Sequence, residues 1–121
     1  MSKRVAVVGA GPSLRFENRV GGADLNPYMA LSAIVAAGLH GVASKLELPP
    51  VFEGDAYRDE RLPRVPASLA EARDLFASSS IALEAFGEDV VEHYVHAADV
   101  ELAAFGRAVT DWERVRGFER L

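Results

Sequence analysis

The segment Leu14–Val20 constrains the fold of this chain most strongly, because charged and uncharged residues alternate along it. The charged positions are Arg15, Glu17 and Arg19. A period of two is typical of a β-strand that packs one of its faces against the protein. The sequence therefore predicts a strand here that carries two cations and one anion on its other face.

A second strand is predicted just before it, at the apolar run Val5–Val8. Residues Gly9–Ser13 are rich in turn formers, so the two strands are expected to form a β-hairpin with a long turn. The segment Val7–Pro12 also resembles the start of a dinucleotide-binding fingerprint. That motif needs a third glycine at position 14 and a helix after the loop, whereas Leu14 and a strand pattern follow here. A Rossmann domain is therefore disfavoured.

A central helix is predicted over residues 26–46. Asn26 suits the N-cap position, and Pro27 suits the first helical position, where its missing N–H is not needed. Two stripes line the helix, one of large apolar residues (Leu31, Val35, Leu39, Val42 and Leu46) and one of small residues (Ala30, Ala33, Ala37 and Gly41). Apolar residues on most sides indicate burial. We expect this helix to be the most buried element, in contact with the hairpin and the C-terminal helix.

Residues 47–67 contain four prolines, which predicts a long irregular connection over the surface. Ser68 and Glu71 then have the spacing of a capping box, so a helix is expected to start there and to reach Ala77. Its inward side chains are predicted to be Leu69, Ala72, Leu75 and Phe76. A second short helix is predicted at Ile81–Phe86, closed by Gly87.

Apolar residues then recur at intervals of three and four from Glu88 to Val115, which predicts one long amphipathic helix with a bend at Gly106. The C-terminal helices together occupy residues 68–121. The predicted fold class is α+β: a β-hairpin over residues 1–20 followed by a mostly α-helical bundle, in one partial domain that covers residues 1–121.

Composition limits the classes of function. The chain has 121 residues, a formal net charge of −5 and no cysteine. The acidic balance argues against nucleic-acid binding, and the lack of cysteine removes disulfides and thiolate metal sites. The longest apolar run, near Tyr28–Leu39, is shorter than the ~18 residues that cross a bilayer. We expect a cytoplasmic protein that binds neither nucleic acid nor a membrane.

The strongest chemical signal is the charged face of the strand. Carboxylates such as that of Glu17 bind Mg²⁺ or Mn²⁺, and arginine side chains such as those of Arg15 and Arg19 fit phosphate and carboxylate oxygens. The alternative is a ladder of cross-strand ion pairs without a ligand, which spacing alone favours because surface ion pairs are common.

Two other groups are weaker candidates. The first is the set Glu92, His93, His96 and Asp99 on the last helix. On a helix, Glu92, His96 and Asp99 share a face. Zinc sites usually need a fourth ligand and the sequence indicates none elsewhere, so we favour a solvated helix face over a metal site. The second is Trp112, for which packing into the protein, with its charged neighbours exposed, is favoured over a recognition patch.

Several segments together resemble the glutamine synthetase family. The pattern Arg15-Phe16-Glu17-Asn18-Arg19, followed by the helix start at residues 23–30 (ADLNPYMA), is similar to the C-terminal part of the family's catalytic domain. Further similar segments are Ala36–Gly41, Gly54–Tyr57, Leu62–Leu69, Phe86–Glu88 and Val109–Glu113. The resemblance covers residue 5 to the end of the chain, and the combined pattern is more specific than any one segment.

The resemblance implies an ATP-dependent ligase that joins glutamate to ammonia or an amine. By resemblance, Glu17 matches the carboxylate that binds the first divalent metal, Mg²⁺ or Mn²⁺. Arg19 matches an arginine that contacts glutamate and the transferring phosphoryl group, and Arg15 matches one beside the ATP phosphates. These roles agree with the chemistry, because phosphoryl transfer depends on positioning and on charge neutralisation by cations.

The chain departs from the family pattern in two ways. Position 6, where the family carries another phosphate-binding arginine, is Ala6, and Arg4 is the candidate to replace it. The segments that resemble the N-terminal β-grasp domain and the strands with the other metal carboxylates are not in this sequence. We therefore expect a catalytic-domain segment that is inactive alone and that associates with itself. The alternative is a non-catalytic helical module that docks on a full-length relative.

Overall fold

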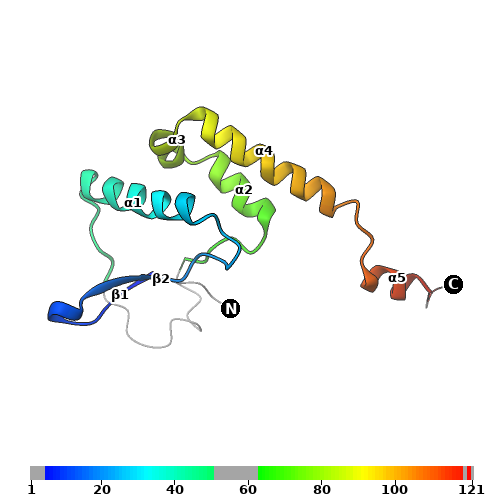
Figure 1. Ribbon diagram of the computed structural model, residues 1–121, viewed down its shortest axis with the longest axis horizontal. Coiled ribbons are helices and arrows are strands. Elements are labelled where there is room, and N and C mark those ends of the chain that lie inside the picture. The colour runs from blue at the N-terminus through cyan, green and yellow to red at the C-terminus, as the bar shows by residue number, and fades with distance from the viewer. Residues whose placement is uncertain (1–4, 51–62, 119, 121) are drawn as a thin grey trace. The chain divides into compact units, whose positions relative to one another are not determined.

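We describe the chain from a computed structural model that covers residues 5–50, 63–118 and 120. Strands β1 (Val5–Val8) and β2 (Arg15–Asn18) come first, and helices α1 (Pro27–Ala43), α2 (Leu69–Ala77), α3 (Ser80–Phe86), α4 (Glu88–Phe105) and α5 (Asp111–Phe118) follow (Figure 1). This order confirms the predicted α+β class, with a hairpin followed by helices.

Contacts group the chain into two compact units, unit 1 (Met1–Pro66) and unit 2 (Ala67–Leu121). The organisation of residues 1–121 as one partial domain stays a prediction. The predicted surface connection over residues 47–67 lies largely outside the described residues.

In unit 1, β1 and β2 form the predicted hairpin. The strands are antiparallel, with Ala6 opposite Glu17 and Val8 opposite Arg15. Gly9 has a φ of 88°, and a Cβ there would lie 2.2 Å from the carbonyl oxygen of Ser13, so the turn requires glycine at this position. A strand, and not a helix, follows the turn, in agreement with the rejection of a dinucleotide-binding loop.

Helix α1 begins as its sequence predicts. The Asn26 side chain accepts hydrogen bonds from the backbone N–H groups of Tyr28 and Met29, at 3.0 and 3.2 Å, and Pro27 takes the first helical position. These bonds satisfy two of the donors that a helix start leaves without a partner inside the helix.

The end of α1 comes earlier than the predicted Leu46. The helix stops at Ala43, and Lys45 adopts a φ of 50°. Lys45 N–H then donates to Val42 O at 3.2 Å, and Leu46 N–H donates to Gly41 O at 3.0 Å. This pair of bonds is a Schellman motif, which closes the helix with a residue other than the usual glycine.

The prediction that α1 is the most buried element is wrong. Leu31, Val35 and Leu39 are 63%, 60% and 65% exposed. The described elements of unit 1 are this helix and a two-stranded hairpin, which offer too little surface to cover a helix that is apolar on most sides. The stripe therefore identifies residues that share one face of the helix, but that face is exposed and not buried.

In unit 2, local signals set the ends of α2, α3 and α4. Ser68 Oγ accepts from Glu71 N–H at 3.2 Å, which confirms Ser68 as the cap of α2. The Glu71 carboxylate accepts from Ala67 N–H at 2.7 Å, one residue before the Ser68 N–H that a capping box uses. Ser79 Oγ caps α3 through Ala82 N–H at 3.1 Å. Gly87, with a φ of 80°, separates α3 from α4.

The packed centre of unit 2 lies where α2 and α3 contact α4. Ala82 and Val91 are buried there, and the rings of Phe76 and Tyr94 meet edge to face with centroids 6.4 Å apart. Ala72 and Phe76 are half-buried, as predicted for the inner side of α2. Leu69 and Leu75, also predicted to point inward, are instead 47% and 61% exposed.

The predicted single helix from Glu88 to Val115 is wrong. Helix α4 ends at Phe105, and α5 begins at Asp111 after a non-helical stretch (Figure 1). Thr110 N–H donates to Glu113 Oε2 at 2.8 Å, and Thr110 Oγ1 accepts from Glu113 N–H at 3.4 Å. This capping box starts a new helix, and it overrides the apolar repeat that continues across the break.

Candidate functional site

The charged face of β2 is the candidate site, and the strand sets its geometry. Glu17 and Arg19 are two residues apart, so the alternation of side chains puts them on one side. Arg19 Nε donates a hydrogen bond to Glu17 Oε1 and forms an ion pair with it, which confirms that they share that side. The Glu17 side chain is 30% exposed and that of Arg19 is 68% exposed, so both groups can be reached from solvent.

Arg15 occupies the same strand but has a different environment. Its Nη1 donates to the carbonyl oxygen of Ser13 at 3.4 Å, so the side chain turns toward the hairpin loop. Among the described interactions it forms no ion pair with Glu17. Arg15 and Arg19 both follow the alternation of the sequence, but their side chains have different described hydrogen-bond acceptors.

Within the described residues, the register of the hairpin gives no support to a cross-strand ladder of ion pairs. Directly opposite residues on antiparallel strands are the closest cross-strand neighbours. Glu17 stands opposite Ala6, and Arg15 stands opposite Val8, so neither faces a charged residue across the strands. The described ion pair runs along the chain, from Glu17 in β2 to Arg19, which follows the last residue of the strand. Arg4, the candidate to replace the family arginine at position 6, lies outside the described residues.

The chemistry of this donor set suits an ion-binding site. One carboxylate can supply oxygen ligands to a hard divalent cation, and two guanidinium groups can bind phosphate or carboxylate oxygens. Glu17 alone supplies at most two of the roughly six oxygens that Mg²⁺ takes. Other groups, from substrate, water or further protein, must complete the coordination.

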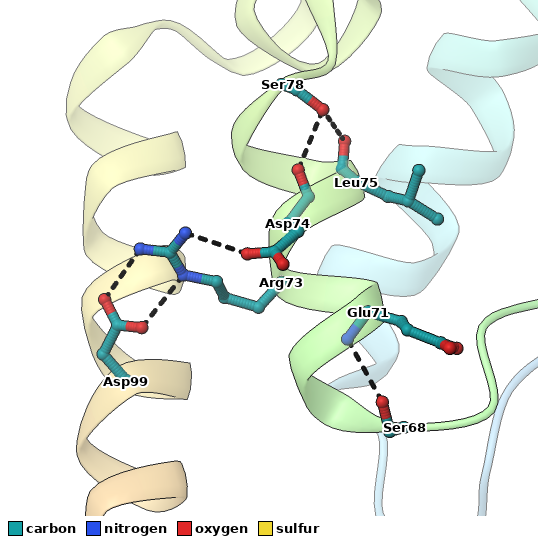
Figure 2. A network of polar contacts seen from close by, with 7 residues as sticks. All are labelled: Ser68, Glu71, Arg73, Asp74, Leu75, Ser78 and Asp99. Atoms are coloured by element: carbon teal, nitrogen blue, oxygen red, sulfur yellow. Dashed lines mark hydrogen bonds and ion pairs between the residues drawn. The ribbon is translucent and has the colours of Figure 1, made fainter.

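The Glu92, His93, His96 and Asp99 set does not come together as a metal site. Asp99 instead accepts two hydrogen bonds from Arg73 of α2, at 2.9 and 3.0 Å, while Arg73 also pairs with Asp74 at 3.1 Å (Figure 2). Over the described ranges, no group of three or more His, Cys, Asp or Glu side chains is arranged to hold a metal ion.

The Arg73–Asp99 pair is the polar interaction that sequence reasoning missed. Its hydrogen bonds lower the pKa of Asp99 below its ordinary value of 3.8, with a smaller contribution from His96, and they raise the pKa of Arg73. The two residues are 26 positions apart, so no local pattern could reveal their contact. The pair connects α2 to α4.

Trp112 is a further correction. Its side chain is 66% exposed, so the favoured interpretation of a packed tryptophan is wrong. The guanidinium of Arg116, one turn further along α5, lies 5.0 Å from the centre of the ring. This cation–π contact covers one face of the indole without burying it.

Comparison with known proteins gives a consistent result. The family model described as the catalytic domain of glutamine synthetase matches residues 2–116. Gamma-glutamylethanolamide synthetase of Streptomyces coelicolor is 54% identical over 115 residues, which are 95% of this chain and 25% of that protein. Type-1 glutamine synthetase 2 of Dictyostelium discoideum is 40% identical over 117 residues, which are 93% of this chain and 22% of that protein.

A third relative, glutamate–isopropylamine ligase of a Pseudomonas species, is 36% identical over 113 residues, covering 92% of this chain and 25% of that protein. The chain spans about a quarter of the length of these curated relatives. Within the part of the chain that the structure covers, no helix is long and apolar enough to cross a membrane.

Proposed function

Because this chain belongs to the glutamine synthetase family, we propose that it is a catalytic-domain segment of an ATP-dependent ligase, which joins ammonia or an amine to glutamate. The observation that carries the proposal is that Glu17 of β2 and Arg19, which directly follows this strand, lie together and remain accessible. Two of the relatives described above are named for ligation of amines larger than ammonia, so the proposal covers both kinds of nitrogen donor.

In this proposal each charged residue has its own role. Glu17 is a ligand of Mg²⁺ or Mn²⁺, because a carboxylate is the ligand type that these cations prefer. Arg19 contacts glutamate and the phosphoryl group in transfer, and Arg15 contacts the phosphates of ATP. When bound, the metal supplies positive charge beside the phosphates. The arginines neutralise and orient the same oxygens, which is most of what this chemistry requires.

We expect no glutamine or glutamyl amide formation by this chain alone. Glu17 is one carboxylate, whereas the cation needs about six oxygen ligands. Arg15 and Arg19 are exposed to water, where each contact with a phosphate contributes little. Glutamate and ATP must also be held in line for the transfer, and a two-stranded hairpin provides no enclosure for both.

The test is ADP release by the purified chain with ATP, Mg²⁺, glutamate and ammonia, and in a parallel reaction with ethanolamine. Release at the background rate is expected in both. Turnover above background that is lost in Glu17→Ala would overturn the expected inactivity, while it would support the assigned role of Glu17.

The second candidate is a non-catalytic module that associates with itself or with a full-length relative. The favouring observation is the apolar stripe of α1, whose residues are mostly exposed. Among the described residues the sheet has two strands, so each strand has an edge that the other does not pair, and such edges accept further strands. Light scattering tests it: association with rising concentration is expected, and a stable monomer at high concentration would contradict it.

A further inference from the structure

Glu17 and Arg19, which have separate proposed roles, form an ion pair with each other. Residue 6, opposite Glu17 in the hairpin, is alanine, which has no charge to offer across the strands. The carboxylate of Glu17 instead accepts from Arg19 on its own strand. The group proposed to bind a cation and the group proposed to bind an anion are therefore bound to each other.

We propose that this ion pair couples the two binding events, so that a divalent cation and an oxyanion each strengthen the binding of the other. The inference rests on the proposed function, since it concerns the same site. A cation on Glu17 competes with the guanidinium of Arg19 for the carboxylate oxygens. An oxyanion on Arg19 competes with the carboxylate for the guanidinium N–H groups.

Coupling follows because each ligand removes a competitor of the other. When an oxyanion binds Arg19, the guanidinium no longer donates to the Glu17 carboxylate. A cation can then bind the carboxylate without displacing the guanidinium. By linkage, the cation must favour the oxyanion by the same factor. The site thus binds metal and phosphate together more readily than it binds either alone.

Arg15 provides a matched comparison on the same strand. Arg15 precedes Glu17 by two residues, as Arg19 follows it by two, and both arginines carry one positive charge. The described hydrogen bond of Arg15, however, goes to the Ser13 carbonyl. Removing Arg15 changes the net charge near Glu17 as much as removing Arg19 does. Only the removal of Arg19 also breaks the ion pair.

The expected coupling is modest because the pair is accessible to solvent. Exposed ion pairs contribute up to about 1 kcal/mol of interaction free energy, so we expect the metal affinity to change by about fivefold at most. The experiment is a Mn²⁺ titration of the purified chain, with and without sulfate. Sulfate stands in for a phosphoryl group because it complexes free Mn²⁺ weakly, and chloride at equal ionic strength is the control.

In the native chain, and in Arg15→Gln, sulfate is expected to lower the Kd for Mn²⁺. In Arg19→Gln, Mn²⁺ is expected to bind more tightly without sulfate, by up to about fivefold, and to lose its response to sulfate. Far-UV circular dichroism checks that the variants keep the helix content of the native chain.

Equal gains in Mn²⁺ affinity for Arg15→Gln and Arg19→Gln would overturn the coupling, because general charge would then account for both. Weaker Mn²⁺ binding in Glu17→Gln, together with no effect of sulfate on the native chain, would overturn the coupling and leave the proposed metal role intact. Unchanged Mn²⁺ affinity in Glu17→Gln would remove both the coupling and the proposed role.

Discussion

The ion pair Arg73–Asp99 of unit 2 and the ion pair Glu17–Arg19 of unit 1 place the same chemistry in different settings. Arg73 and Asp99 are 26 positions apart and connect two helices, with two hydrogen bonds between them. Glu17 and Arg19 are two positions apart and belong to one strand region. The Arg73–Asp99 pair can form only when α2 packs on α4, whereas the Glu17–Arg19 pair needs only an extended chain segment.

From this difference we infer that the Arg73–Asp99 pair supports the packing of the helices and that the Glu17–Arg19 pair is available to ligands. The Arg73–Asp99 pair is one polar link between α2 and α4, beside the edge-to-face contact of Phe76 with Tyr94. The described contact between Glu17 and Arg19 links two nearby residues of one chain segment and does not join two helices. We therefore propose that ligands bind near Glu17 and Arg19, and that the Arg73–Asp99 pair supports the packing of unit 2.

The largest expected effect is in the packed centre of unit 2. Val91 is 8% exposed, so Val91→Asp places a carboxylate among apolar groups and is expected to destabilise unit 2 by about 3 kcal/mol. Val100→Asp, on the same helix at a side chain that is 51% exposed, is the control and is expected to have little effect. Urea unfolding followed by circular dichroism measures both, and equal losses would mean that the packed centre lies elsewhere.

The second effect, smaller than the first, concerns the pair that joins α2 and α4. Arg73→Leu and Asp99→Asn are each expected to lower the unfolding midpoint, since each leaves the other partner without its ion pair. In the double variant the two losses should not add, because both remove the same interaction. Strict additivity in this double-mutant cycle would show that the Arg73–Asp99 contact contributes no coupling in solution.

The same pair predicts a third effect, which depends on pH. The pKa of Asp99 is lowered from 3.8 by its hydrogen bonds to Arg73, so its contribution to stability is present above that value and is lost as the pH falls below it. His96 and Asp74 are the other titratable groups beside the pair, and they remain in the variant. Asp99→Asn should therefore show a weaker loss of helix content on acidification than the native chain. Identical acid transitions would contradict this.

The smallest expected effect is on the stability of unit 1. Arg19→Gln should leave the thermal unfolding of the chain unchanged within error, because an exposed pair along one strand contributes little. Arg15→Gln is the charge-matched comparison and should behave in the same way. A clear destabilisation by Arg19→Gln alone would assign that pair a structural role and remove the contrast with Arg73–Asp99.

Local signals in the sequence predict much of the fold. Asn26, Ser68 and Gly87 begin or end helices through hydrogen bonds and backbone angles that depend only on neighbouring residues. The capping box at Thr110 and Glu113 is equally local, and the apolar repeat across residues 88–115 concealed it. Where two local signals conflict, the cap decides the boundary here.

Burial and long-range pairing could not be predicted in the same way. The stripe containing Leu31 and Val35 predicts a shared face, but exposure depends on which other elements cover that face. The contact of Arg73 with Asp99 depends on how α2 packs on α4. For the candidate site, the period of two predicts that Glu17 and Arg19 share a side, whereas the register that places Ala6 opposite Glu17 comes from the structure.

The most direct test compares two carboxylates, Glu17 and Asp99, each of which is paired with an arginine. The measurement is the Mn²⁺ affinity of the purified chain, of Glu17→Gln and of Asp99→Asn, with circular dichroism to verify folding. The account predicts that Glu17→Gln weakens Mn²⁺ binding and that Asp99→Asn leaves it unchanged. Loss of Mn²⁺ binding in folded Asp99→Asn, with native affinity in Glu17→Gln, would contradict the assignment of ligand binding to β2.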